Sequence, residues 1–139
     1  MKKENESIED GKLLKLQFSP ALHRDGTRAP DLIDVILQEV NSDSNLFLGS
    51  MDKKAWRETQ RYKRVVLYSK SRKKLWHKGK TSGNELEVIE VYVNCEQTTL
   101  LIKVFPLGRG VCHTKDKKGN FRQSCFYRKI NNGKLIFMV

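Results

Sequence analysis

The sequence predicts an α+β domain made mostly of antiparallel sheet with one or two short helices. Short β-prone runs recur along most of the chain, and polar, glycine- or proline-containing breaks separate them. Only one segment, residues 53–60, has a clear helix start signal. The chain has 139 residues, which suits a single domain, and it contains no internal repeat or low-complexity block.

The N-terminal part is expected to differ from the rest. Residues 1–30 are predicted to form a tail with a short first strand, and residues 31–139 to form the main domain. Within the first part, the apolar residues 13–18 are the predicted strand, which Pro20 would stop. Turn-forming and charged residues at 23–30 predict a loop.

A hairpin and a helix are expected next. Residues 34–40 and 45–49 are β-prone and flank the polar residues 41–44, a pattern typical of a hairpin. The carboxylate of Asp52 can accept the free amide protons of a first helical turn, which predicts a helix over residues 53–60. The side chains expected on its buried face are Ala55, Trp56 and Thr59.

The second half of the chain is predicted to be strand-rich. Further strands are expected at residues 64–69, 86–93, 98–105, 111–114, 124–130 and 135–139. So much strand in a short chain leaves sheet edges to cover, and dimerisation is a common way to cover them. The sequence therefore favours a homodimer.

The composition restricts the environment more than the partner. Lysines and arginines total 27 against 16 aspartates and glutamates, a formal charge of +11, which attracts anions to the surface. Nucleic acid, a phosphorylated small molecule and an acidic protein all fit this charge. No run approaches the roughly 20 apolar residues of a membrane helix, and the polar N-terminus does not resemble a secretory signal. We therefore expect a soluble cytoplasmic protein that does not contact the membrane.

A basic segment at residues 68–83 combines cations, hydroxyls and two glycines. Backbone amides at the glycines and the side-chain hydroxyls can cradle a phosphate, and the cations can add charge-assisted hydrogen bonds. The alternative is a solvated basic loop, although a tryptophan among charges usually packs on a base or a neighbouring strand. The candidate substrate-binding residues are Arg72, Trp76, Lys78, Gly79, Thr81, Ser82 and Gly83.

Three cysteines, Cys95, Cys112 and Cys125, are the candidate metal ligands. An odd number argues against a disulfide framework, and their wide spacing matches no zinc finger. Three dispersed ligands are typical of catalytic zinc, which keeps a fourth position for water; small buried hydrophobes are the alternative interpretation. If residues 111–114 form a strand, His113 points away from Cys112, which favours proton transfer over metal ligation.

In their order along the chain, these motifs resemble the phosphoribosyl-AMP cyclohydrolase family. Tyr68-Ser-Lys-Ser-Arg72 resembles its Ser-Arg-Ser-Arg segment, and Leu75-Trp-His-Lys-Gly-Lys-Thr-Ser-Gly83 matches its Leu-Trp-x-Lys-Gly-x-Thr-Ser-Gly. Cys112-His-Thr114 and Ser124-Cys-Phe-Tyr-Arg128 match the last two motifs. The resemblance covers about residues 32–129.

The resemblance implies an enzyme of histidine biosynthesis that opens the adenine ring of a phosphorylated nucleotide by hydrolysis between C6 and N1. It implies an intertwined homodimer in which Cys95 of one subunit and Cys112 and Cys125 of the other hold zinc. Zinc would activate the attacking water near neutral pH, and His113 would move the protons. The groups expected to grip the two phosphates are Arg72, Lys78, Thr81 and Ser82.

One departure concerns the family's second metal site. The family surrounds its first cysteine with three aspartates that hold magnesium, whereas this chain has Asn94, Glu96 and Thr98. Because magnesium prefers carboxylate oxygens, we expect weak binding or none at this degenerate site. Residues 115–123 are also longer than the family's linker between the last two cysteines, and we expect them to bulge outward.

Three functions remain open at this stage, in order of preference. The first is an active zinc cyclohydrolase with a degenerate magnesium site. The second is a divergent paralogue that keeps the fold and the zinc but binds a nucleotide or phosphorylated ligand without turnover, which the loss of two carboxylates favours. The third is a nucleic-acid-binding protein with structural zinc, which only the charge and a few aromatic residues support.

Overall fold

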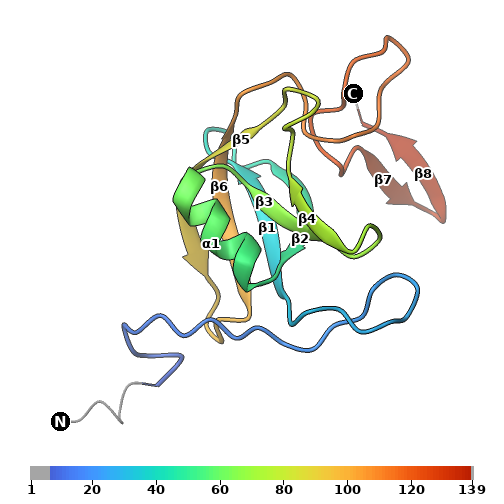
Figure 1. Cartoon of the computed structure of the whole chain (residues 1–139). Coiled ribbons are helices and arrows are strands. Elements are labelled where there is room, and N and C mark those ends of the chain that lie inside the picture. The colour runs from blue at the N-terminus through green and yellow to red at the C-terminus, as the bar shows by residue number, and fades with distance from the viewer. Residues whose placement is uncertain (1–6, 139) are drawn as a thin grey trace.

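A computed structural model describes residues 7–138 as a mixed four-stranded sheet, two small hairpins and one α-helix (Figure 1). Residues 1–6 of the predicted tail, and Val139 of the predicted last strand, lie outside the described residues. The elements are β1 (Ile33–Glu39), β2 (Asn45–Met51), α1 (Lys53–Tyr62), β3 (Val66–Ser69), β4 (Lys74–His77), β5 (Leu86–Val93), β6 (Thr99–Pro106), β7 (Arg128–Asn131) and β8 (Lys134–Phe137).

The main sheet has the strand order β2-β1-β6-β5. The predicted antiparallel pairing holds for β1 with β2 and for β5 with β6. The central pair, β1 with β6, is parallel, with Asp34 opposite Thr99 and Glu39 opposite Val104. Parallel neighbours need a long crossover connection, and here every element from β2 to β5 lies between the two strands.

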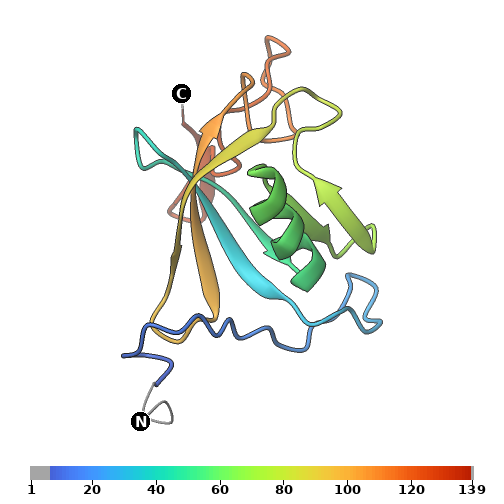
Figure 2. The same cartoon turned by 60° about the vertical axis from the view of Figure 1, so that its left-hand side comes forward.

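The core lies on one face of this sheet. Alternate side chains of the two central strands are at most 1% exposed, which is the period-2 pattern of a half-buried strand. They are Ile33, Val35, Leu37, Leu100, Ile102 and Val104. Figure 2 shows α1 and the β3–β4 hairpin together on one side of the sheet, and residues of both belong to the same core cluster.

The helix begins as predicted. Asp52 is the N-cap, and its carboxylate accepts a hydrogen bond from the amide of Ala55 at 2.8 Å. Ala55 and Thr59 are buried as expected, whereas Trp56 is only partly buried. The Thr59 hydroxyl accepts from the Val66 amide and donates to its carbonyl, which fixes the helix to β3. Among the described helices, none is long and apolar enough to span a membrane.

Two predicted strands are wrong, because their backbone amides bond elsewhere. Residues 13–18 form no strand: the amides of Lys15 and Gln17 donate to Gln97 in the β5–β6 turn. Residues 111–114 are a bent loop in which the amides of two successive residues donate to the single carbonyl of Arg122. A strand cannot direct adjacent amides to one acceptor, because successive amides point to opposite sides.

The long linker between the last two cysteines forms a small surface loop. A bridge between Lys115 and Phe121 closes it, and the Asp116 carboxylate accepts the amides of Lys118 and Asn120. Residues 115–120 are exposed, as expected for an outward bulge. The strand predicted at 124–130 begins only at Arg128, so the cysteine at 125 lies in irregular structure.

Candidate functional site

Cys112 and Cys125, here called the thiol pair, come together although twelve residues separate them in the chain. Their side chains are close enough to hydrogen bond to each other. The Cys112 Sγ also contacts the Thr114 hydroxyl at 2.9 Å and its amide at 3.4 Å. Cys125 is fixed to the start of β2, because its amide donates to the Leu46 carbonyl at 2.8 Å.

The two thiols differ in their affinity for a proton. Burial opposes ionisation of Cys112, but the Thr114 hydrogen bonds, the bond to Cys125 and the Lys78 ammonium outweigh it and lower the pKa. For Cys125, burial and the neighbouring Cys112 raise the pKa to about 12. The metal-free pair is therefore suited to one thiolate that accepts a hydrogen bond from one thiol.

Lys78 is only 3% exposed and lies next to the thiol pair. Its ammonium donates a hydrogen bond to the Val111 carbonyl and lies 4.8 Å from the ring centroids of both Phe47 and Trp76. Burial lowers the pKa of this ammonium, and the two cysteines oppose that effect. The predicted phosphate contact of Lys78 would require its ammonium to leave these partners.

Cys95 lies far from the thiol pair. It is exposed in the turn between β5 and β6, whereas the thiol pair follows the other end of β6. Each of the two strands has eight residues and so spans roughly 26 Å. Zinc–sulfur bonds are about 2.3 Å long, so Cys95 cannot join Cys112 and Cys125 of its own chain on one zinc ion. Correspondingly, no three His, Cys, Asp or Glu side chains gather as a metal site within residues 7–138.

The donor set nevertheless suits zinc if a third ligand comes from another chain. Two thiols in contact supply the soft ligands that zinc prefers, and Cys95 is exposed and free. An exposed cysteine at one end of the sheet and a thiol pair at the other can meet across two copies of the chain. The chemistry of the residues therefore fits zinc between subunits.

The residues at the degenerate magnesium site do not fit that ion. The side-chain oxygen of Asn94 accepts the amides of Thr98 and Thr99, and its amide donates to the Thr98 hydroxyl at 2.8 Å. Asn94 and Thr98 therefore hold the turn together by bonding to each other. Only Glu96 offers a carboxylate, and Mg²⁺ is usually held through carboxylate oxygens.

The basic segment is not one loop, because β4 divides it. Arg72 is exposed in the turn before β4, whereas Gly79, Thr81 and Ser82 follow it, and the strand between them spans roughly 13 Å. The amide of Gly83 is not free for a phosphate, because it donates to the Gly79 carbonyl at 2.8 Å. The candidates thus fall into two groups at opposite ends of β4.

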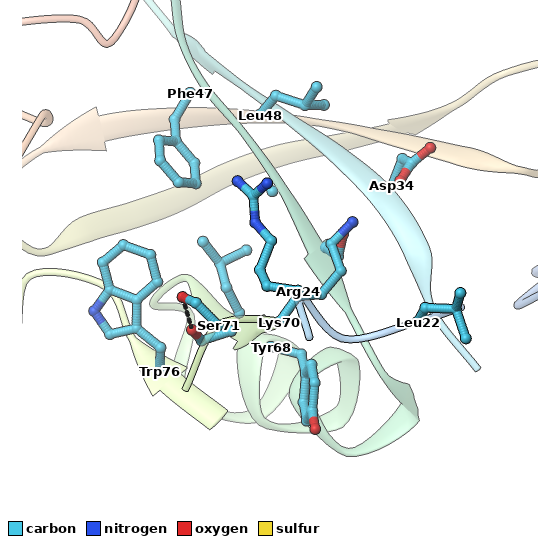
Figure 3. Close-up of a pocket in the computed structure, with 13 residues that line it drawn as sticks. Leu22, Arg24, Asp34, Phe47, Leu48, Tyr68, Lys70, Ser71 and Trp76 are labelled. Carbon is cyan, nitrogen blue, oxygen red and sulfur yellow. Dashed lines mark hydrogen bonds between the residues drawn. The ribbon is translucent and has the colours of Figure 1, made fainter. Parts of the chain in front are cut away.

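A pocket of about 390 Å³ opens beside the first of these groups, and we call it the Arg24 pocket (Figure 3). Ligand pockets are usually of this size or larger. Phe47, Leu67 and Trp76 supply apolar surface, and the cations are Arg24 and Lys70. Figure 3 shows these two cations extending their charged ends into the pocket. Of the predicted substrate-binding residues, Trp76 lines it.

His113 is exposed directly beside the buried Cys112. The prediction that the two side chains point apart rested on a strand, and the backbone there is a bent loop instead. The proton-transfer role of His113 stays a prediction.

Sequence reasoning missed Arg24, Lys70 and Phe47. Arg24 belongs to a loop distant in sequence from the basic segment, so no local pattern connects the two. Phe47 follows the alternation of β2 and carries no signal beyond that of a strand residue. Lys70 lies inside the basic segment, but its spacing there does not distinguish it from the five other lysines and arginines of the segment.

Known proteins match most of this chain. The family model for phosphoribosyl-AMP cyclohydrolase matches residues 47–127. A phosphoribosyl-AMP cyclohydrolase of Nitrosomonas europaea is 36% identical over 108 residues, which are 78% of this chain and 79% of that protein. The protein of that name from Hyphomonas neptunium is 42% identical over 106 residues, 76% of each chain.

The likeness extends to a larger protein. The histidine biosynthesis bifunctional protein HisIE of Buchnera aphidicola is 40% identical over 110 residues, which are 79% of this chain and 50% of that protein. The matched family region contains both the thiol pair and the basic segment. This chain is a member of the phosphoribosyl-AMP cyclohydrolase family.

Proposed function

We propose that this chain is a zinc-dependent phosphoribosyl-AMP cyclohydrolase of histidine biosynthesis that works as an intertwined homodimer. The observation that carries the proposal is the contact between Cys112 and Cys125 in a member of this family. Phe47 and Trp76 connect this thiol pair to a pocket of nucleotide size, because Lys78 lies over both rings and both rings line the pocket.

The zinc ligands in this proposal are Cys112, Cys125 and Cys95 of the partner subunit. A zinc ion held by three protein ligands supplies a water molecule that ionises near neutral pH. The chain's own contribution is to fix two ligands rigidly. Cys125 is bonded through its backbone to β2, and the Cys112 loop is bonded through the Val111 carbonyl to Lys78.

The proposed reaction adds water across one bond of the adenine ring. The phosphoribosyl group on N1 makes the ring cationic and C6 electrophilic. The water oxygen ends on C6, which becomes a carboxamide carbon, while the C6–N1 bond breaks and N1 takes a proton. His113 is the proposed proton carrier, since it is exposed beside Cys112 and imidazole titrates near neutral pH. The proposed substrate contacts remain Arg72 before β4, Trp76 on it, and Lys78, Gly79, Thr81, Ser82 and Gly83 after it.

Exposed apolar surface supports the homodimer. The outer strand β5 bonds to residues 63–65 only along its first residues, and beyond them it carries exposed Ile89, Val91, Tyr92 and Val93. A surface of this kind usually marks an interface. The C-terminal hairpin adds further exposed large side chains: Ile130, Leu135, Ile136, Phe137 and Met138.

A second candidate is a paralogue that binds the nucleotide without turnover. The turn that carries Cys95 favours it, because hydrogen bonds between Asn94 and Thr98 occupy positions where the family has carboxylates. Zinc and the dimer would be retained in this case, and the magnesium-dependent part of the family's chemistry would be lost.

The deciding experiment is turnover of phosphoribosyl-AMP by zinc-loaded protein, followed by absorbance with and without added magnesium. Ring opening at equal rates in both conditions would support a cyclohydrolase whose activity does not depend on magnesium. An intact zinc-bound dimer without turnover would favour the paralogue. A His113→Ala variant that keeps zinc and full activity would remove His113 from the mechanism.

A further inference from the structure

The Arg24 pocket has a wall that belongs to the N-terminal loop and not to the family-matched region. Three contacts hold this loop against the β3–β4 hairpin. The Arg24 amide donates to the Lys70 carbonyl at 3.2 Å, the His23 ring contacts the Tyr68 hydroxyl at 2.8 Å, and Asp25 pairs with Lys73 at 2.6 Å. Contacts of Arg24 itself and of both its chain neighbours thus hold its backbone at the pocket.

The polar lining of the pocket suits an anion. Arg24 and Lys70 contribute two positive charges, and Asp34 contributes the one carboxylate among the lining residues. The hydroxyls of Ser69 and Ser71, 3.3 Å apart, lie in the same turn as Lys70. Guanidinium, ammonium and hydroxyl groups together are the donors that bind a phosphate group.

The aromatic end of the pocket leads toward the thiol pair. The Phe47 and Trp76 rings meet edge to face with centroids 5.9 Å apart, and both line the pocket. Lys78 does not line the pocket, but its ammonium lies over both rings and beside the thiol pair. A nucleotide with its phosphate at the cations would therefore direct its base toward the reacting end.

We propose that Arg24 and Lys70 bind a phosphate group of the nucleotide substrate, with its base on the side of Phe47 and Trp76. The inference rests on the proposed function for the identity of the substrate, but not for the phosphate site itself. It gives the N-terminal loop a direct part in binding, through a residue outside the family-matched region.

The test compares AMP with adenosine as probes, by calorimetry on the full-length zinc-loaded protein at low salt. Arg24→Gln and Lys70→Gln should each weaken AMP binding about tenfold to a hundredfold, the loss of a charge-assisted hydrogen bond. Adenosine, which lacks the phosphate, should bind wild type and variants alike. The matched controls are Arg57→Gln and Lys54→Gln, which remove the same charges from the exposed face of α1.

Two results would overturn the phosphate site. One is AMP binding that stays at the wild-type level in the double variant Arg24→Gln/Lys70→Gln. The other is a wild-type protein that binds AMP no better than adenosine. Failure of the proposed function looks different: AMP binding would depend on Arg24 and Lys70 while phosphoribosyl-AMP is not turned over. If turnover occurs, the variants should raise KM and leave kcat nearly unchanged.

Discussion

At the scale of single residues, Lys78 lies between the pocket and the thiol pair. A buried lysine is costly unless its charge is compensated, and here a carbonyl, two aromatic rings and two thiols surround the ammonium. The ammonium donates its hydrogen bond to the Val111 carbonyl, so Lys78 holds the loop that presents Cys112.

Lys78→Met should destabilise the metal-free protein by about 1–3 kcal/mol, because the buried Val111 carbonyl loses its donor while the side chain keeps its length. Urea denaturation monitored by tryptophan fluorescence measures this change. Lys74→Met is the control: Lys74 is exposed on β4, which ends just before Lys78, so its loss should cost less than about 0.5 kcal/mol. Equal stability of the two variants would show that the hydrogen bond from Lys78 to Val111 does not stabilise the loop that carries Cys112.

Zinc binding should release protons from the thiol pair. The pKa of Cys125 is raised to about 12, so the metal-free pair keeps that proton at neutral pH, and a zinc ligand must lose it. Because the proton competes with the metal, zinc affinity should fall about tenfold per pH unit, for each proton displaced, as the pH is lowered from 8 to 6. Calorimetry in two buffers with different ionisation enthalpies counts the protons. Zinc binding with no proton released would contradict the assignment of Cys125 as a ligand.

At the scale of elements, the loop between β4 and β5 depends on one glycine more than on the other. Gly79 and Gly83 both have positive φ, +82° and +81°. A Cβ on Gly79 would lie 2.1 Å from the Asn84 carbonyl oxygen, whereas a Cβ on Gly83 would meet nothing within 4 Å. The first glycine is therefore required by space as well as by backbone conformation.

Gly83→Ala should cost about 1–2 kcal/mol, the strain of a left-handed alanine. Gly79→Ala should cost at least about 3 kcal/mol, since backbone must also move. Each variant serves as the other's control, because the chemical change and the φ angle are the same. Thermal unfolding of both proteins measures the difference, and equal losses would mean that the loop can relax around Asn84.

Local patterns predicted the elements that carry their own signals. The hairpin of β1 and β2 and the helix capped by Asp52 follow from alternation and one carboxylate. The strand β4 was missed because its residues, Lys74 to His77, lie among charges, and its pairing with β3 supplies the missing stabilisation. The prediction of a strand at 111–114 is wrong because the hydrogen bonds that its amides donate to the Arg122 carbonyl leave no signal in a four-residue pattern.

The site residues, too, include some that a local sequence pattern predicts and some that it does not. Residue type alone makes the cysteines and Trp76 site candidates, and the structure brings Cys112 and Cys125 into contact and places Trp76 at the pocket. The Arg24 pocket depends on a loop more than forty residues from Lys70 in the chain, and the parallel pairing of β1 with β6 is equally non-local. Long-range pairings of this kind are set by how the whole core packs, so no short motif reports them.

At the scale of the whole molecule, the separation of Cys95 from the thiol pair makes an assembly prediction. The two positions lie at opposite ends of the β5–β6 hairpin. If the zinc site forms between subunits, Cys95→Ser and Cys112→Ser variants each lack one ligand in both sites of their homodimers. A dimer with one chain of each kind regains one complete site, because the Cys112→Ser chain supplies Cys95 and the Cys95→Ser chain supplies the thiol pair.

Co-expression of the two variants should therefore restore zinc and activity, whereas separately made variants should lack both. With random pairing, half of the dimers are mixed and each has one intact site of two, so about a quarter of the wild-type sites should return. Co-expression of a Cys112→Ser/Cys125→Ser chain with Cys95→Ser should complement equally well, because the double variant still supplies Cys95. Co-expressed Cys112→Ser and Cys125→Ser chains should not complement, because each breaks the same thiol pair. No restoration in the first combination would contradict a site shared between subunits, and restoration in the last would mean that Cys112 and Cys125 of one site come from different chains.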